Sequence, residues 1–426
     1  MTFHSITKIV CFASLVSFAQ VASAETVRYI NGHWFSGTHF VKRDVAVRDG
    51  IIVTASNAAS NASRTVDLRG GFVIAGLAEA HNHNLQNCYM APQMAQAYLK
   101  RGILYSAQLY ATDPAALQCA PLFETRAAPS TAFARIGVTS TTGHPIGIAR
   151  AGAKEAGMNM SFDELTEGML IADSVSDLQR KWAHIKTTRT DFVKVILIDE
   201  VNATQNAKNP KLDGFNGVTR DVMGALVPLA RGAGLRLVAH VDTAADFKLA
   251  VEAGVGTIAH LPGYRIAKNH GVEDYRLSDD VVKAAAAKGV AVIPTMAASA
   301  YHLAARPADA AAVAGLYSHN LGLLRKHGVK LLTGSDRFEG SVLDELDALA
   351  GTGLFQPAEL IKMSTLTTAQ WMFPHRRVGC LEEGCEASFN VYPQDPLQDL
   401  ARLAKPVTVV KQGAIVVNEG KPVSPE

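Results

Sequence analysis

The sequence has no block of basic residues, no stripe of interleaved aromatic and basic residues, and no repeated or low-complexity segment. Its 426 residues carry 41 Lys and Arg against 39 Asp and Glu, a net charge of +2. Nucleic-acid binding usually requires a strongly basic surface, so no nucleic-acid partner is expected. Beyond the N-terminus there is also no run of about 20 apolar residues, which excludes a conventional membrane-spanning helix.

The N-terminus holds the longest apolar run. Residues 9–21 are almost wholly apolar, follow Lys8 and precede the small residues Ala22-Ser23-Ala24. This order is typical of a secretory signal peptide, and the run is too short to span a bilayer comfortably. We therefore expect residues 1–24 to be removed after Ala24 and the mature protein to be secreted or periplasmic, with no membrane partner.

Cysteine is scarce, and one of the five cysteines lies within the expected signal peptide. The even number that remains in an exported chain suggests disulfides, for which three pairings exist. We favour Cys88–Cys119 and Cys380–Cys385, because each bridge then stays within one region of the chain. Four unpaired thiols, or Cys88 as a metal ligand, are the alternatives.

Three patterns follow one another along the mature chain. Residues 25–75 are short alternating runs separated by the turn signals Asn31-Gly32 and Asp49-Gly50, which predicts a small β unit. Residues 76–375 alternate strand-like and helix-like runs, which predicts a parallel sheet covered by helices. A segment of about 300 residues with this pattern fits an α/β fold of the (β/α)₈ TIM-barrel type. Residues 376–426 return to short β runs, and we expect the two end segments to form one composite β-sandwich.

Polar side chains stand at the ends of several predicted strands. On a strand, residues i and i+2 project from the same face, so the two histidines of EAHNHN are predicted to point at one place. In a TIM barrel the chemistry lies at the carboxyl ends of the strands. Each candidate has a structural explanation when taken alone: a hydrogen-bonded histidine, an outward lysine or a helix-capping aspartate. Together they indicate a metal site, and they are His81 and His83 in GLAEAHNHN, Lys194 in DFVKVIL, His240 in GLRLVAH, His260 in GTIAH and Asp336 in LLTGSD.

In these stretches, and in AVEAGVGTIAHLPG, GVAVIPT and STLTTAQWMFPHRRVGC, the chain resembles the amidohydrolase superfamily of metal-dependent hydrolases. It looks most similar to the branch with imidazolonepropionase-like and prolidase-like enzymes, over nearly the whole mature chain. The resemblance implies a (β/α)₈ barrel flanked by a composite β-sandwich, and two divalent metal ions, with zinc the first choice. It implies these ligands: His81, His83 and Asp336 for the more buried ion, His240 and His260 for the second, and Lys194, carboxylated by carbon dioxide, as the bridge.

This ligand set suits hydrolysis. A lysine ammonium offers a metal no lone pair, whereas a carboxylated lysine is an anion that can bridge two metals about 3.5–4 Å apart. A water between two such cations loses a proton near neutral pH and becomes the nucleophile. Asp336 is expected to take that proton and to pass it to the leaving nitrogen.

The chain departs from the family pattern at four positions that are not ligands. Glu79 stands where Asp is usual, Ala259 where Glu is frequent, Ser335 where Thr is frequent and Ser388 where Asp is usual. The first two affect the support of the metal ligands. Deaminases of this family bind one metal and use a glutamate three residues after the fifth-strand histidine, and Thr243 occupies that place here, which weighs against deamination.

Four residues are candidates for substrate binding. His144 in TTGHP is expected to end the third strand and to contact substrate. A substrate with a free carboxylate needs a cation besides the metals, and Arg265 and Arg337 follow ligand-bearing strand ends, with Tyr264 as a neighbouring hydroxyl donor. The alternative for each is a solvated loop residue. Histidines that fit no strand end are given no role: His184, His270, His302, His319, His327 and His375.

We therefore expect an exported binuclear hydrolase that cleaves an amide bond in a small molecule, such as a dipeptide or an N-acyl amino acid, by attack of a metal-bridging hydroxide. A lactonase or phosphotriesterase can use the same site, and a barrel that binds a ligand without turnover belongs to a different class. A homo-oligomer stays open, because nothing in the sequence addresses the oligomeric state.

Overall fold

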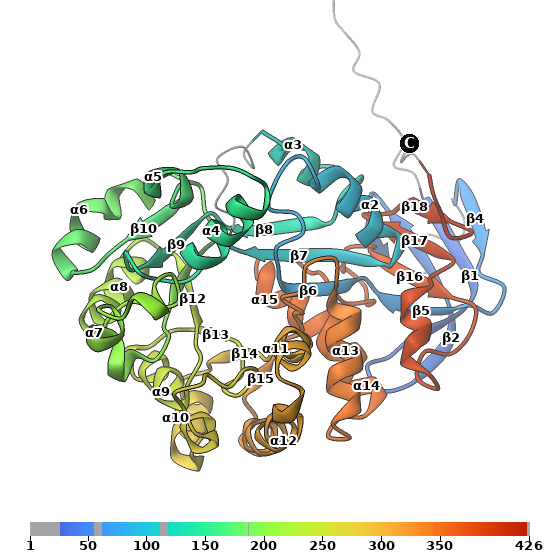
Figure 1. Cartoon of the computed structure of the whole chain (residues 1–426). Coiled ribbons are helices and arrows are strands. Elements are labelled where there is room, and N and C mark those ends of the chain that lie inside the picture. Colours follow the sequence, from blue (N-terminus) through green and yellow to red (C-terminus); the bar gives the residue numbers. More distant parts are fainter. Residues whose placement is uncertain (1–25, 55–61, 111–117, 186, 424–426) are drawn as a thin grey trace, which may run out of the picture.

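The computed structural model describes residues 26–54, 62–110, 118–185 and 187–423 (Figure 1). The signal peptide expected over residues 1–24 lies outside this part of the chain. Within it, none of the helices has the length and apolar character that a bilayer crossing requires.

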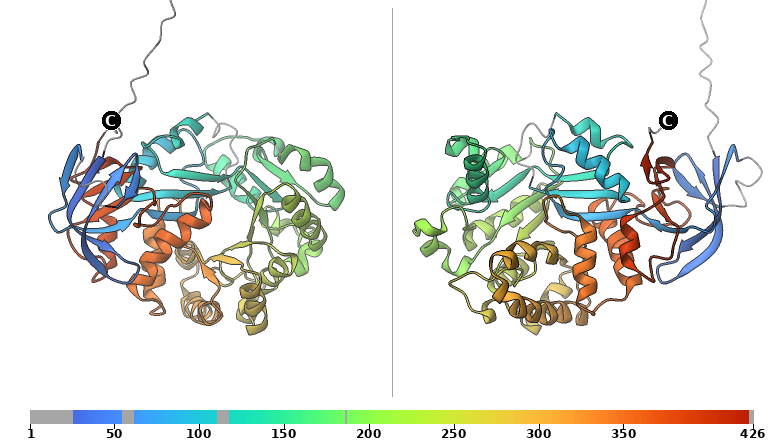
Figure 2. Two further views of the ribbon diagram at one scale, coloured as in Figure 1. Left: turned by 180° about the vertical axis from the view of Figure 1, so that it is seen from behind. Right: turned by 45° about the vertical axis from the view of Figure 1, so that its right-hand side comes forward.

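Both ends of the chain contribute to one nine-stranded sheet, in which β5 pairs antiparallel with β16. Figure 2 shows the N-terminal and C-terminal strands side by side at one end of the molecule. The two end segments, expected to form a composite β-sandwich, thus share a single hydrogen-bonded sheet. Its strands are β1 (Thr26–Phe35), β2 (Phe40–Arg48), β3 (Ile51–Val53), β4 (Arg64–Asp67), β5 (Phe72–Ala75), β16 (Phe389–Tyr392), β17 (Thr408–Lys411), β18 (Ala414–Asn418) and β19 (Lys421–Pro422).

The middle of the chain forms two parallel sheets, as its alternating pattern predicts. One has the order β6-β7-β8 and the other β10-β9-β11-β12-β13-β14-β15. Their strands are β6 (Leu77–Asn82), β7 (Ile103–Leu109), β8 (Ser130–Ala134), β9 (Ile136–Thr139), β10 (Met169–Ile171), β11 (Phe192–Ile196), β12 (Arg236–His240), β13 (Thr257–Ala259), β14 (Ala291–Ile293) and β15 (Lys330–Leu331).

Backbone contacts connect the two parallel sheets on both sides. Only Arg135 separates β8 from β9, and the Asp191 N–H donates to the Phe133 carbonyl at 2.9 Å. On the other side, the Ala80 N–H donates to the Thr333 carbonyl at 2.8 Å, just beyond the end of β15. The strands consequently surround a common interior, with helices on the outside (Figure 1).

The helices begin and end at recognisable signals. At α9, Thr243 and Asp246 form a capping box, and Gly254 follows the helix with φ 90°, a conformation that favours glycine. The helices are α2 (Ala91–Lys100), α3 (Ala120–Phe123), α4 (Ile146–Glu155), α5 (Phe162–Leu165), α6 (Val175–Ile185), α7 (Ala203–Asn206), α8 (Arg220–Gly232), α9 (Ala244–Ala253), α10 (Asp279–Ala287), α11 (Ser299–Ala305), α12 (Ala310–Lys326), α13 (Val342–Gly351), α14 (Pro357–Lys362) and α15 (Thr368–Met372).

Burial on both faces explains the composition of the inner strands. Every residue of β11 is buried, and Lys194 is the single charged residue among its apolar neighbours. Parallel strands that are covered on both faces read as continuous apolar runs, so a lysine here stands out. An ammonium group in such a place is unfavourable unless it has a partner or loses its charge.

Four cysteines of the described part of the chain form two disulfides. Cys88 is bonded to Cys119 and Cys380 to Cys385, which confirms the pairing favoured from the sequence. The first bridge ties the segment after β6 to the segment before α3. Cys88 is therefore not available as a metal ligand.

Candidate active site

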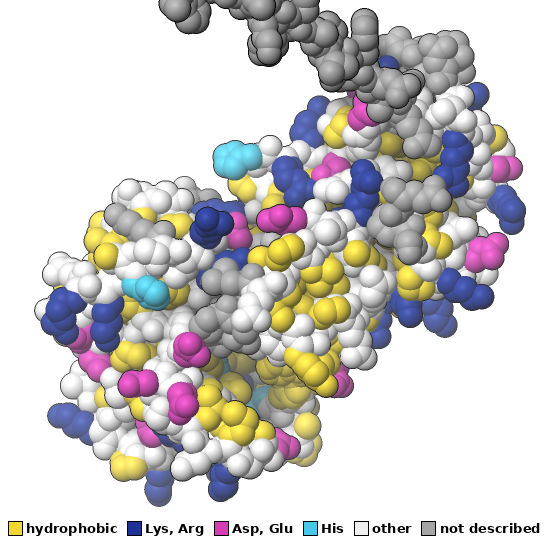
Figure 3. Space-filling view, turned by 90° about the horizontal axis from the view of Figure 1, so that it is seen from above, with side chains coloured by type: hydrophobic (Ala, Val, Ile, Leu, Met, Phe, Trp, Pro, Cys, Tyr) yellow, Lys and Arg dark blue, Asp and Glu magenta, His cyan; other side chains and the backbone are white. Residues whose placement is uncertain are grey.

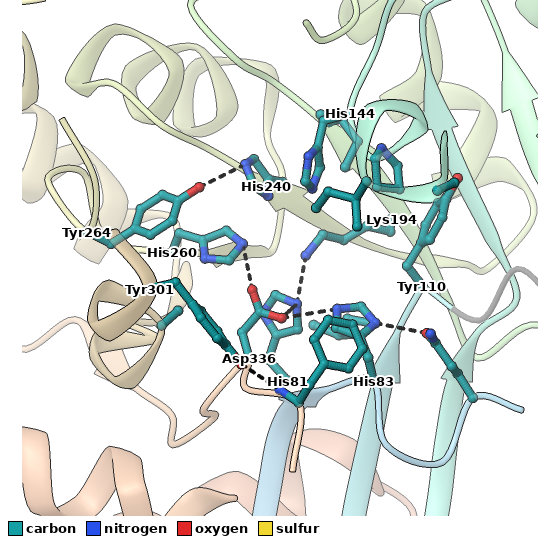
Figure 4. A pocket seen from close by; sticks show the side chains of 18 of the residues that line it. His81, His83, Tyr110, His144, Lys194, His240, His260, Tyr264, Tyr301 and Asp336 are labelled. Atoms are coloured by element: carbon teal, nitrogen blue, oxygen red, sulfur yellow. Dashed lines mark hydrogen bonds and ion pairs between the residues drawn. The ribbon is translucent and has the colours of Figure 1, made fainter. Parts of the chain in front are cut away.

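The carboxyl ends of the parallel strands surround a cavity of about 720 Å³. A volume of this size is typical of small-molecule sites. Figure 4 shows side chains from several strands pointing towards one another within it. Nine of the residues singled out from the sequence line it: His81, His83, His144, Lys194, His240, His260, Tyr264, Arg265 and Asp336.

Three of these residues form a compact group of potential metal ligands. His81 lies on β6, His83 just after it, and their Nε2 atoms are 3.6 and 3.1 Å from Asp336 Oδ1. One ligand atom from each of the three residues lies within 4.8 Å of the other two. Asp336 adopts a left-handed backbone conformation, φ 48°, and its N–H donates to the His81 carbonyl at 2.7 Å. The chain thus holds the carboxylate against both imidazoles.

Lys194 reaches the same place from β11. Its Nζ is 3.4 Å from His81 Nε2, and the residue is 2% exposed. Burial lowers the pKa of the Lys194 amine from 10.5 to about 7. A large fraction of the amine is therefore uncharged near neutral pH, which is the form that has a lone pair.

His240 and His260 complete the ring of donors. Their imidazole centroids are 4.2 Å apart, and His260 Nε2 is 3.7 Å from Asp336 Oδ2. His260 directly follows β13 with φ 75°, so its backbone turns at the strand end. Burial lowers the pKa of His81, His240 and His260, which keeps these three imidazoles neutral.

Hydrogen bonds to the far ring nitrogens orient three of the imidazoles. A ligating histidine normally uses its second nitrogen in this way, which fixes the tautomer and the ring plane. One nitrogen of each ring is thereby left for the cavity: Nε2 of His83 and His260, and Nδ1 of His240. The bonded pairs are His83 Nδ1 with Gln86 Oε1 at 3.0 Å, His260 Nδ1 with Thr295 Oγ1 at 2.7 Å, and His240 Nε2 with Asp242 Oδ1 at 3.3 Å.

The charge of the group also fits a cation. Burial raises the pKa of the Asp336 carboxyl, but His81, His83 and Lys194 outweigh this effect and hold it below its usual value. A buried carboxylate then faces several neutral nitrogen lone pairs. Carboxylate oxygen and imidazole nitrogen are the donors that zinc and similar divalent ions prefer.

The Glu79 carboxyl supports the backbone next to the His81, His83 and Asp336 group. Its Oε1 accepts from the His81 N–H at 3.1 Å and the Ser335 N–H at 2.8 Å, and its Oε2 accepts from the Ser335 hydroxyl at 2.9 Å. Burial raises the pKa of Glu79 to about 8. The carboxyl thus links β6 to the residue before Asp336.

Asp242 is a residue of this site that the sequence argument did not single out. It is 4% exposed, and its carboxylate accepts from Arg265 Nε at 3.2 and 3.0 Å and from Arg265 Nη2. The Tyr264 hydroxyl also donates to it, at 2.8 Å. Burial raises the pKa of Asp242, but Arg265 and His240 outweigh burial and keep it ionised. Its position two residues beyond His240 on the same strand end was the available signal.

The other expected substrate residues differ in their placement. His144 lines the cavity, with its ring 5.0 Å from that of His240, but it lies in the turn beyond β9, which ends at Thr139. Its N–H donates to the Asn216 carbonyl at 2.7 Å. Arg337 is not among the lining residues, and its Nη1 lies 3.5 Å from Asp344 Oδ1.

Several lining residues were missed from the sequence, and two of them are Tyr110 and His302. Tyr110 directly follows β7, with φ 117°, and its buried hydroxyl has no partner among the described residues. His302, given no role above, lines the cavity from α11 and contacts Asp309 through Nε2 at 2.8 Å. Tyr110 directly follows a strand, so the strand-end pattern that pointed to the candidate metal ligands applies to it as well.

The outer surface has charges of both signs. On the face shown in Figure 3, basic and acidic side chains are spread among patches of apolar side chains. This distribution agrees with the near balance of 41 basic and 39 acidic residues.

Comparisons with known proteins were made on the sequence and on the fold. The sequence profile described as "Amidohydrolase family" matches residues 72–416. No curated protein gives a significant sequence match. A solved Xaa-Pro dipeptidase with bound methionine superposes with a TM-score of 0.72 at 18% identity, covering 92% of this chain and 99% of that one. A. niger ochratoxinase gives 0.72 at 17%, covering 93% and 96%, and phenylurea hydrolase B gives 0.70 at 16%, covering 94% and 99%. At these identities the structures show a shared fold.

Proposed function

The chain belongs to the amidohydrolase family, and on that premise we propose that it hydrolyses an amide bond of a small molecule with two divalent metal ions, zinc by preference. The observation that carries this proposal is the convergence of six donor side chains at the strand ends of one cavity. The orientation of His83, His240 and His260 by bonds to their far nitrogens supports it further. Such support is expected of ligands rather than of ordinary buried histidines.

We propose that the six donors form the two groups that the resemblance to the family implies. His81, His83 and Asp336 would hold the first ion, and His240 and His260 the second, with Lys194 between them. When bound, the ions would supply an activated water and polarise the scissile carbonyl.

Lys194 is suited to carboxylation. Its neutral amine nitrogen can attack the carbon of carbon dioxide, which forms an N–C bond and releases one proton. The product is an anion with two oxygen donors, and the pKa of about 7 makes the reactive neutral amine abundant. A buried ammonium next to His81 would instead repel a cation.

We propose Asp336 as the group that moves a proton. Its carboxylate lies in the centre of the group, ionised and partly open to the cavity. In the reaction water adds to the carbonyl carbon, the C–N bond breaks, and the leaving nitrogen gains the proton that the water loses. Asp336 would carry that proton, while His144 and Tyr264 on the cavity wall would position the substrate.

Three further statements belong to this proposal. The parallel strands would form one closed eight-stranded barrel, which the Ala80–Thr333 and Asp336–His81 backbone bonds support. The shared nine-stranded sheet would fold into the composite sandwich. The protein would be exported, with which its two disulfides agree.

Metal content and turnover together test the proposal. Purified protein should contain about two divalent ions per chain and should hydrolyse members of an amide library. Lys194→Ala should lose turnover and regain part of it with short carboxylic acids that replace the bridge. The exposed Lys208 offers the matched control, since Lys208→Ala should change neither property.

Asp336→Asn should lower turnover at least ~100-fold, with metal content measured alongside.

Three results would contradict it. A single ion with an unmodified Lys194 would remove the binuclear centre. Turnover confined to lactones or phosphotriesters would assign the site to those substrates. Binding without turnover of any amide, ester, lactone or phosphotriester in the metal-loaded protein would make the chain a ligand-binding barrel.

A further inference from the structure

We propose that the substrate is uncharged and carries an apolar acyl or aryl group next to its scissile amide. This inference rests on the hydrolase function proposed above and adds the class of substrate to it. The group would bind to an apolar wall of the cavity, made of Leu109, Ile148, Leu165, Met169, Ile196 and Phe338.

Apolar side chains extend from the floor of the cavity to its mouth. Leu109 and Ile196 end β7 and β11 and are almost completely buried, at 0% and 2% exposure. Ile148 and Phe338 line the same cavity but are 50% and 56% exposed. Large apolar side chains left open to water around a pocket mark a binding surface, because a ligand that covers them removes that area from water.

The two cations that line the cavity are already engaged. Lys194 belongs to the metal group, and Arg265 donates from Nε and Nη2 to the buried Asp242 carboxylate. Arg337 lies outside the lining and next to Asp344. Among the described residues, no other Lys or Arg lines the cavity, and residues 111–117 contain neither. A substrate carboxylate would therefore lack a free cation other than the metal ions, which disfavours its burial.

Two polar side chains that line the cavity, Tyr264 and His144, also fit an uncharged substrate. The Tyr264 hydroxyl donates to Asp242, so it has no proton left for a substrate anion. His144 also lines the cavity, and its buried Nδ1 has no hydrogen-bond partner among the described residues, so it is open to a polar group such as the amide of a substrate.

A substrate series measures both parts of the inference. In N-acyl anilides with acyl chains of two to eight carbons, kcat/KM should rise by up to about fourfold for each added CH₂, the factor that corresponds to burial of one methylene. For each chain length, the analogue with a terminal carboxylate should be hydrolysed at least about tenfold less efficiently. A flat series, or carboxylated substrates that match or exceed their neutral partners, would overturn the inference.

A charge placed on the wall should reverse the preference. Ile148 is half exposed, so Ile148→Lys should fold, lose at least about tenfold in kcat/KM on neutral long-chain anilides and gain on their terminal carboxylates. Ile148→Ala removes apolar area without adding a charge, so a comparison of this variant with Ile148→Lys separates the two effects. Val201, 69% exposed and outside the cavity lining, provides the control, since Val201→Lys should change neither substrate class.

Equilibrium binding separates this inference from the proposed catalysis. Ketone analogues, with CH₂ in place of the amide NH, cannot be hydrolysed, and calorimetry gives their dissociation constants on metal-loaded protein. Tighter binding of the neutral ketone than of its carboxylate partner, reversed by Ile148→Lys, would support the substrate class even if no amide were turned over. Equal binding of both ketones, with normal amide turnover, would overturn the substrate class and leave the hydrolase function intact.

Discussion

Replacement of Asp242 by Asn removes the carboxylate that holds Arg265 in place. The Asp242 side chain is 6% exposed and that of Arg265 is 30% exposed. Breaking a buried ion pair from one side costs about 3–5 kcal/mol, because the remaining charge has no partner. Arg265 keeps some solvent, which reduces this cost, so Asp242→Asn should lower the free energy of unfolding by about 2–3 kcal/mol.

Urea unfolding of the metal-free protein, followed by circular dichroism, measures this loss without a contribution from bound ions. The double variant Asp242→Asn/Arg265→Met should recover part of it, since the unpaired charge is then gone. The Arg150–Asp213 pair is the matched control, with side chains 46% and 38% exposed, and Asp213→Asn should cost less than about 1 kcal/mol. Equal losses in Asp242→Asn and Asp213→Asn would refute the reasoning.

The same change has a consequence for substrate choice. Once Asp242 is neutral, the guanidinium of Arg265 is free to pair with a carboxylate, for which its planar fork is suited. Asp242→Asn should therefore raise kcat/KM for terminal carboxylates relative to neutral anilides. Its overall activity should fall, because Nε2 of His240 would then bond to a neutral amide in place of a carboxylate. An unchanged ratio between the two substrate classes would mean that Asp242 does not control the availability of Arg265.

Three more predictions concern stability. Gly137→Ala should lower the free energy of unfolding by more than about 1–3 kcal/mol, because the new Cβ would lie 1.4 Å from Tyr110 Cε2. In α4, the Cβ of Gly152→Ala meets nothing within 4 Å, so this variant should be more stable than wild type by about 0.5–1 kcal/mol. Urea unfolding that ranks the two variants the other way would contradict this. Burial lowers the pKa of Lys411 to about 8 in the folded protein, so above that pH the unfolded chain binds more protons than the folded one. The stability of wild type relative to Lys411→Met should therefore increase as the pH rises from about 8 to about 10. A stability difference that stays constant with pH would count against this. Glu79→Gln should be tolerated, because burial raises the pKa of Glu79 to about 8 and keeps its carboxyl mostly protonated. Glu79→Ala should lower the free energy of unfolding by about 3 kcal/mol, because two buried N–H groups then have no acceptor. Similar melting temperatures for the two variants would show that this carboxyl does not support the site.

The proposed metal ligands were accessible to sequence reasoning because each lies in or next to a strand whose pattern is clear. His240 ends an apolar run, and Lys194 interrupts one. The fold class could be read for the same reason, since strands buried on both faces alternate with capped helices. The disulfides followed from the proximity of their cysteines within regions of the chain.

Other placements depended on contacts between distant segments. His144 was expected at a strand end but lies in a turn, held by the Asn216 carbonyl from a loop beyond β11. Arg265 and Arg337 both follow ligand-bearing strands, and nothing in their local sequence separates them. Only the structure shows that one lines the cavity in a pair with Asp242 and that the other lies beside Asp344.

The sequence by itself determined the α/β class and the set of candidate ligands, because strand periodicity and residue chemistry are local properties of the chain. The family followed from the resemblance of its motifs. The tertiary structure decided which ring nitrogens face the cavity, which arginine is neutralised and which apolar side chains form the wall. Each of these depends on how different βα units are arranged around one cavity, which Ile148, Ile196 and Phe338 line together. Such contacts arise from loop conformation and long-range packing, which the periodicity of a single chain does not encode.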